Sequence, residues 1–272
     1  MLISAAIEQT RAKDATGFQF KAMSTDFDGL VDGVIGVPLF ETYQLALPEH
    51  PDLLRLDSKI RRAVKKASRS GMRVRDAETI GELKAWYDLY LQTMRRLVAL
   101  PKPYRFFEQA WRRLHPEGVL RLLLAEQVQA GQSRLIAGIL LLQWGQTVSY
   151  SFAGWRREDQ NLRPNDLLHW HAIQSACEEG GRWYDFGNVR VGNQGLIQFK
   201  RKWGAETASI YRYSYPSVPG VSPATGNSFN PASSPNQSRG SRVRHWVTPL
   251  WQHLPIRTVR LIGDCCHTLR YY

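Results

Sequence analysis

The sequence predicts a mixed α/β protein built on a central sheet with flanking helices. Its 272 residues are 43% hydrophobic, which is enough apolar material to bury a core. Residues 119–152 contain three strand-like runs in succession, separated by turns at Gly131 and Gly145. Segments with helical spacing lie on both sides of these runs, and this order is typical of a layered α/β fold.

The first predicted elements are a helix at 4–15 and two strand-like segments at 18–20 and 43–48. A helix is then predicted over 52–70, because its apolar residues repeat on one face and Gly71 follows as a C-cap. The apolar positions are Ile60, Val64 and Ala67. The rest of this helix is basic, at Lys59, Arg61, Arg62, Lys65, Lys66 and Arg69.

A short strand at 72–75 precedes two helices, at 79–97 and 104–114, and Thr79 is a candidate cap for the first. Three strands are then expected, at 119–126, 135–144 and 147–152. A further helix starts at Asn165 or Asp166 and ends at Gly180.

The most distinctive stretch begins with Tyr184-Asp185-Phe186-Gly187, where an apolar segment ends in glycine. After a polar loop, a helical turn within 195–204 carries Lys200 between two aromatic residues, Phe199 and Trp203. A strand over 208–215 follows, and Pro216 closes it. The order is therefore strand, loop, basic and aromatic helix, strand.

This order resembles the C-terminal domain of the FemAB-like family, which has the GNAT-type fold and attaches amino acids to peptidoglycan precursors. The resemblance extends from about Ser4 to Pro216 and is most specific between Tyr184 and Gly204. It implies an acyltransferase of the GNAT-type fold, with a mixed central sheet and flanking helices. In this family the phenylalanine and lysine of the short helix lie in the substrate cleft, and here they are Phe199 and Lys200.

The chain is expected to divide into four parts. FemAB-like proteins contain two GNAT-type halves, and residues 1–50 resemble an incomplete first half that lacks several strands, while 51–216 form the acyltransferase domain. Either the start is misplaced or the chain is a shortened member. Residues 217–241 form a linker rich in serine, proline and glycine, and 242–272 form an amphipathic helical tail.

The resemblance implies catalytic roles for Lys200 and Asp185. On the short helix Phe199 is expected to face the core and Lys200 the rim of the cleft, where its ammonium binds an anionic acceptor or stabilises an oxyanion. A solvated lysine is the alternative. Asp185 equally fits a surface acid paired with Arg190. The expected substrate-binding residues are Phe199, Arg163, Arg190, Tyr150, Trp170 and Lys202.

The acyl donor is the least determined part of the prediction. GNAT enzymes that use acetyl-CoA hold its pyrophosphate on a glycine-containing loop at a helix N-terminus. Here the corresponding stretch, 160–166, has no glycine, and Pro164 lacks the backbone N–H that would donate a hydrogen bond to phosphate. This departure agrees with the aminoacyl-tRNA donor of FemAB-like members, while an acyl-CoA donor stays open. No cofactor is expected, and no metal, since His169 and His171 lie on different faces of one helix.

The net charge of +12 predicts an anionic partner. From the resemblance, this partner is expected to be an amine-bearing cell-wall or surface-polysaccharide precursor. The alternative function is a degenerate, non-catalytic GNAT-like module that binds anionic polymer or a membrane surface. A cytoplasmic location is expected, because no signal peptide or membrane span is evident and three cysteines form no disulfide framework. The tail has an apolar stripe at helical spacing that docks on its own domain or lies on the inner face of the membrane. The stripe consists of Trp246, Val247, Leu250, Trp251 and Leu254.

Overall fold

The computed structural model describes residues 2–23, 27–29, 34, 36–129, 131–189, 193–216 and 251–268. The predicted linker at 217–241 lies outside these ranges, as do 242–250 and 269–272 of the predicted tail.

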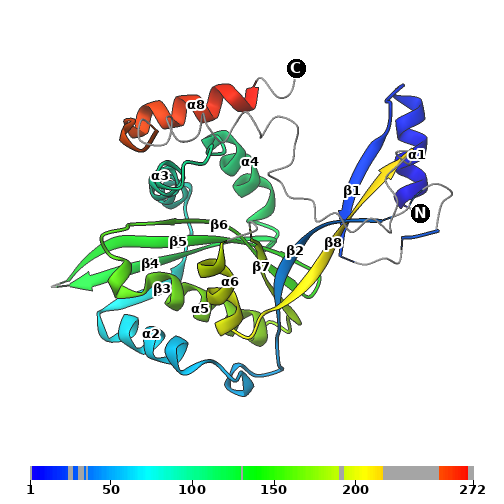
Figure 1. Ribbon diagram of the computed structural model, residues 1–272. Coiled ribbons are helices and arrows are strands. Elements are labelled where there is room, and N and C mark those ends of the chain that lie inside the picture. The colour runs from blue at the N-terminus through cyan, green and yellow to red at the C-terminus, as the bar shows by residue number, and fades with distance from the viewer. Residues whose placement is uncertain are drawn as a thin grey trace.

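One eight-stranded sheet runs through the molecule in the order β1-β8-β2-β7-β6-β5-β4-β3 (Figure 1). All neighbouring strands are antiparallel except β6 and β7, which are parallel. This confirms the predicted mixed α/β class. The strands are β1 (Phe18–Ala22), β2 (Val37–Ala46), β3 (Met72–Asp76), β4 (Leu120–Gln129), β5 (Gln132–Trp144), β6 (Thr147–Trp155), β7 (Trp183–Asn188) and β8 (Glu206–Tyr215).

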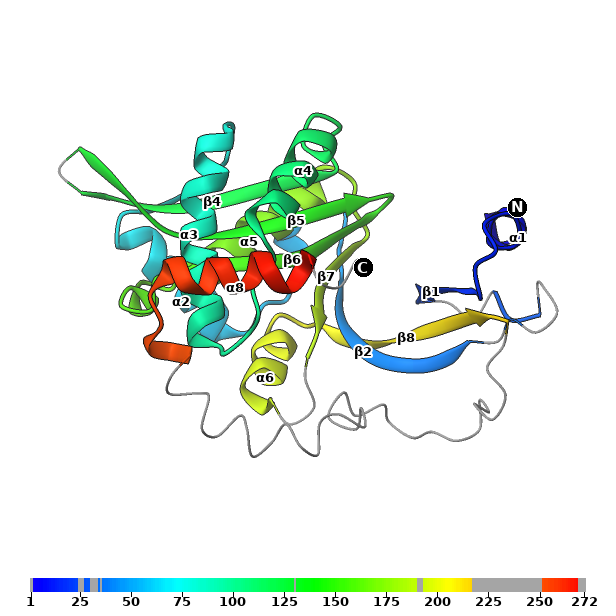
Figure 2. The same cartoon turned by 90° about the horizontal axis from the view of Figure 1, so that it is seen from above.

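Helices cover both faces of the sheet. Figure 1 shows α2 (Ser58–Arg69), α5 (Pro164–Glu178) and α6 (Gln194–Lys202) on one face. On the opposite face lie α3 (Ile80–Arg96), α4 (Tyr104–Leu114) and α8 (Ile256–Thr268), as the view from above in Figure 2 also shows. Short 3-10 turns occupy Pro51–Leu53 and Gln160–Leu162, and α1 (Leu2–Ala12) lies beside β1 at the far end.

The first fifty residues contribute two strands to this same sheet. β2 lies between β7 and β8, with Leu45 opposite Tyr184 and Thr42 opposite Ala208. β1 pairs with the end of β8, where Phe20 stacks on Tyr213 at 4.8 Å between ring centroids. The segment predicted as an incomplete first half therefore adds two strands to the same sheet as residues 51–216.

The face under α3 and α4 is filled with aromatic side chains. Trp86 is fully buried, its indole N–H donates to the carbonyl of Gly138 at 3.0 Å, and its ring lies 5.2 Å from that of Phe107. Thr79 and Glu82 form a capping box at the start of α3, as the sequence predicted for Thr79. This face is a packed core.

The tail docks on its own domain through α8. Val259 is fully buried, and Arg260 forms an ion pair with Asp88 of α3 at 2.7 Å. Of the predicted stripe, Trp251 and Leu254 are half-buried, while the other three residues lie outside the described ranges. None of the helices in the described part of the chain is long and apolar enough to span a membrane.

Candidate functional site

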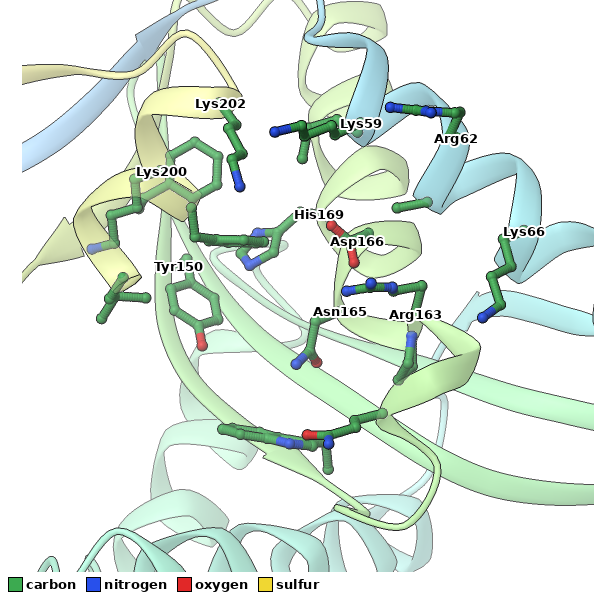
Figure 3. Close-up of a pocket in the computed structure, with 18 residues that line it drawn as sticks. Lys59, Arg62, Lys66, Tyr150, Arg163, Asn165, Asp166, His169, Lys200 and Lys202 are labelled. Atoms are coloured by element: carbon green, nitrogen blue, oxygen red, sulfur yellow. The ribbon is translucent and has the colours of Figure 1, made fainter. Parts of the chain in front are cut away.

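A cavity of about 690 Å³ lies on the α2, α5 and α6 face of the sheet (Figure 3). Its floor is made by Tyr150 and Trp155 of β6 and Phe186 of β7. The lining residues from α2 are Lys59, Ile60, Arg62, Ala63 and Lys66. Those from α5 and the turn before it are Gln160, Arg163, Pro164, Asn165, Asp166 and His169. Those from α6 are Leu196, Phe199, Lys200 and Lys202.

The sheet is irregular where it forms this floor. The parallel pairing of β6 with β7 ends at Ser149 and Asp185, although both strands continue. A bulge against β5 then gives β6 one extra residue between Tyr150 and Phe152. In a regular strand these two side chains would share a face. The bulge puts Tyr150 on the cavity face, while Phe152 packs among the aromatic residues under α3.

The cavity wall is strongly cationic. Lys59, Arg62 and Lys66 recur on one side of α2, and Arg163 and Lys202 face them from α5 and α6 (Figure 3). The one acid among the lining residues is Asp166, and burial raises the pKa of its carboxyl. The electrostatics of the cavity therefore favour an anionic ligand.

Several of the lining residues are buried polar side chains. His169 is buried, its Nδ1 lies 2.9 Å from the Tyr184 hydroxyl, and burial lowers its pKa to about 3. Burial raises the pKa of Tyr150 to about 12, so its phenol is protonated at neutral pH. Oδ1 of Asn165 is buried without a hydrogen-bond partner among the described residues. An unpaired buried acceptor in a cavity suits a ligand that donates a hydrogen bond.

Lys200 differs from its predicted place at the rim. The residue is only 3% exposed, and its ammonium donates to the carbonyls of Gly187 at 2.6 Å and Asn188 at 3.2 Å. The same ammonium lies 5.3 Å from the ring centroid of Tyr43. Burial lowers the pKa of Lys200 to about 8, and the Asp185 carboxylate opposes that shift. The predicted rim position of Lys200 was wrong because its ammonium donates to backbone carbonyls at the end of β7 and is buried there.

The other predicted site residues are distributed as follows. Phe199, Arg163, Tyr150 and Lys202 line the cavity together with Lys200. Asp185 is not among the lining residues, and its Oδ1 accepts hydrogen bonds from the Thr42 hydroxyl and, at 2.7 Å, from the Gly187 amide. Trp170 packs against the core of this face, and Arg190 lies outside the described residues.

Sequence reasoning did not identify two of the lining residues, His169 and Trp155, as part of the site. His169 was considered only as a metal ligand, and its helical position alone gives no sign of the contact with Tyr184. Trp155 lies beyond the predicted end of its strand. Because of the bulge, a simple alternation of side chains along the strand does not predict which face of the sheet Trp155 lies on. A signal was available for α2, because the basic positions 59, 62 and 66 share one side of the helix.

A sequence model of the acetyltransferase (GNAT) domain matches residues 55–201, which are 147 of the 272 residues. The chain belongs to the acetyltransferase (GNAT) domain family. It is therefore an acyltransferase of the GNAT type, and the matched range contains the whole cavity lining except Lys202. None of the curated protein sequences is similar enough to match this GNAT chain.

Solved structures with the same fold include FemX, which is 17% identical with a TM-score of 0.65 over 79% of this chain and 75% of FemX. L-PGS from Bacillus licheniformis is 12% identical, with a TM-score of 0.57 over 79% of this chain and 73% of its own. The C-terminal domain of a putative lysylphosphatidylglycerol synthetase from Agrobacterium fabrum is 14% identical, with a TM-score of 0.51 over 78% and 72%. At these identities the likeness is one of fold.

Proposed function

We propose that this GNAT chain is a FemAB-like enzyme that transfers an aminoacyl or acetyl group to an amine of an anionic cell-wall or surface-polysaccharide precursor. The cation-lined cavity at the end of the β6–β7 pairing carries this proposal. Six lining residues are basic (Lys59, Arg62, Lys66, Arg163, Lys200 and Lys202) against the single acid Asp166.

The favoured donor is an aminoacyl-tRNA. The turn before α5 contains no glycine, and Arg163 starts the helix in a left-handed conformation with φ of 62° and without a side-chain cap. This geometry differs from the glycine loop that holds the pyrophosphate of acetyl-CoA. Structural neighbours named FemX and lysylphosphatidylglycerol synthetase are consistent with aminoacyl transfer to envelope molecules. The alternative donor is an acyl-CoA.

The chemistry is the attack of an amine on an activated acyl carbon. The amine nitrogen forms the new bond to the acyl carbon, and the carbonyl π electrons move onto oxygen. When the carbonyl re-forms, the ester or thioester bond breaks, the leaving oxygen or sulfur takes that electron pair, and the amine proton ends on the leaving group. Such transfer depends on positioning and on stabilisation of the oxyanion.

The proposed roles follow from where the side chains lie. Arg163 and Lys202, which line the cavity, contact the anionic substrate. For Arg190, which lies outside the described residues, substrate binding rests on the family resemblance alone. Lys200 holds the backbone of Gly187 and Asn188 at the end of β7 and adds positive potential to the cavity. The other residues have supporting roles. Asp185 fixes the turn at Gly187, and Trp170 packs α5 onto the sheet. Phe199 and Tyr150 shape the part of the cavity that binds the acyl group.

We place the reaction in the cytoplasm, because charged tRNA and nucleotide-linked precursors are cytoplasmic substrates. An acceptor carried on a lipid would bring the enzyme to the inner face of the membrane.

The experiment is a transfer assay with purified protein and a nucleotide-linked cell-wall precursor that carries a free amine. Radiolabelled aminoacyl-tRNA and radiolabelled acetyl-CoA are supplied in separate reactions, and the acylated product is separated and counted. We expect label in the precursor with aminoacyl-tRNA. The Lys200→Ala variant is expected to lose most transfer, because the turn at Gly187 loses its ammonium.

The alternative function, a non-catalytic module that binds anionic polymer or membrane, gives a different result. Filter binding would then retain tRNA or precursor on the wild-type protein while no donor leads to acylated product. That outcome would contradict the proposed transfer.

A further inference from the structure

His169 lies on the cavity wall, where its ring centroid is 4.9 Å from that of Tyr150 (Figure 3). It projects from α5, is 4% exposed, and packs against the rings of Phe186 at 5.1 Å and Phe199 at 5.6 Å between centroids. The imidazole is therefore held firmly among aromatic rings on the cavity wall.

The hydrogen bond to Tyr184 determines which ring nitrogen carries the proton. Tyr184 is fully buried, and within the described residues Nδ1 of His169 is the partner of its hydroxyl. A buried hydroxyl proton without an acceptor costs about 1–3 kcal/mol. The Tyr184 hydroxyl therefore donates to Nδ1, and the neutral imidazole carries its proton on Nε2.

The surroundings keep this imidazole neutral. Burial lowers the pKa of His169, and the Lys200 ammonium acts in the same direction. The other titratable groups in contact with the ring are the phenols of Tyr150 and Tyr184, and the Asp166 carboxyl and the Lys202 ammonium line the same cavity. A neutral ring with its proton on Nε2 is a hydrogen-bond donor.

We propose that His169 is a catalytic residue whose Nε2–H donates a hydrogen bond to the carbonyl oxygen of the acyl donor. This inference rests on the proposed acyl transfer and names the group that binds the developing oxyanion. When the amine attacks, negative charge grows on the carbonyl oxygen and the Nε2–H···O bond strengthens. The proton stays on Nε2 throughout, so the atom balance of the transfer is unchanged.

A neutral donor suits this position. Removing one preorganised hydrogen-bond donor from an oxyanion site typically lowers kcat by about 10²–10³-fold. The cations on α2 can then bind the phosphate or carboxylate groups of the substrate while His169 acts on the acyl carbon. This separates substrate binding at the cationic wall from chemistry at His169.

The first test needs no substrate. Protein labelled with ¹⁵N in histidine is measured by long-range ¹H–¹⁵N correlation from pH 5.5 to 8.5, and His169 is assigned from its loss in His169→Gln. The expected result is a neutral ring with the proton on Nε2 across this range. In Tyr184→Phe, which removes the donor to Nδ1, the Nε2–H preference should weaken. A proton on Nδ1 or a protonated ring in the wild type overturns the proposal.

The second test uses the donor that supports transfer in the wild type. His169→Phe should lower kcat by about 10²–10³-fold with little change in KM. His169→Gln should recover part of that loss, because the Gln amide places an N–H near the position of Nε2. His171→Gln, on another face of the same helix, is the matched control and should transfer at the wild-type rate.

The outcomes separate the two proposals. Equal losses in His169→Phe and His169→Gln, or a loss confined to KM, overturn the role of His169 while the transferase assignment stands. A wild-type protein that transfers from no donor contradicts the proposed function, and the tautomer of His169 still decides whether the ring is a donor.

Discussion

The two faces of the sheet use aromatic residues in opposite ways. Under α3 and α4, Trp86, Tyr90 and Phe107 pack against one another with ring centroids 5.0–5.6 Å apart. Under α2, α5 and α6, Tyr150 and Phe199 line a cavity whose outer wall is basic. The first face is a packed core, whereas the second combines a packed core with a cavity lined by polar and charged groups, whose burial costs free energy. The bulge in β6 divides these tasks between Tyr150 and Phe152.

The largest expected effect is on the packed face. Trp86→Ala should lower the free energy of unfolding by about 3–5 kcal/mol, because it leaves a cavity and removes the indole hydrogen bond to the Gly138 carbonyl. On the open face Tyr150→Phe should change that free energy by less than about 0.5 kcal/mol, since the described residues give its hydroxyl no hydrogen bond. Urea unfolding of both variants measures the contrast, and equal losses would remove the distinction between the faces.

The next effect concerns the basic wall. The double variant Lys59→Glu/Arg62→Glu reverses two charges that line the cavity, and kcat/KM for an anionic acceptor should fall by about 10²-fold. The matched control Arg61→Glu/Lys65→Glu makes the same charge change at exposed positions of the same helix that do not line the cavity. It should keep activity near the wild-type value. If both pairs lose activity alike, the net charge of the protein matters and the cavity wall does not.

Lys200 should make stability depend on pH. Its pKa is lowered from 10.5 to about 8 on folding, so the unfolded chain binds more protons between these values. The stability of the wild type relative to Lys200→Met should therefore rise by on the order of 2 kcal/mol from pH 7 to pH 10. In the other direction, the same stability is lost as the pH falls from about 10 to about 8. Denaturant unfolding of both proteins at several pH values measures this. A difference that does not vary with pH would mean that the ammonium is solvated.

The smallest effect is expected at α8. Arg260→Ala removes an ion pair with Asp88 in which the two side chains are 38% and 54% exposed. Exposed pairs contribute about 0–1 kcal/mol, so the melting temperature should change by a few degrees at most. Transfer activity should be unchanged, because α8 lies on the packed face (Figure 2). A large loss of activity would connect the two faces and contradict their separation.

Elements with local signals could be predicted from the sequence. The helix at 104–114 has the predicted bounds, and Thr79 caps α3 as expected, because prolines and caps act within a few residues. β2 starts at Val37, six residues before its predicted start, because its pairing with β8 is a contact between distant parts of the chain. Strand ends set by such pairing leave little trace in a local pattern.

The candidate site was predictable only in part, for the same reason. Lys200 and Phe199 were identified through the family resemblance, and both line the cavity. The burial of Lys200 depends on two carbonyls at the end of β7, and the orientation of His169 depends on Tyr184. These contacts form only when α5 and α6 pack onto the sheet, so sequence spacing alone does not reveal them.

The most direct test of the account fills the cavity. Ala63 lines the wall on α2, and Ala63→Trp should block the site, whereas Arg61→Trp places the same ring at an exposed position of the same helix that does not line the cavity. Acyl transfer to the precursor is measured for both variants and for the wild type. The account predicts that Ala63→Trp loses about 10²-fold or more, since small misplacements cost that much, and that Arg61→Trp transfers normally. Full transfer by a folded Ala63→Trp protein would show that the reaction takes place elsewhere.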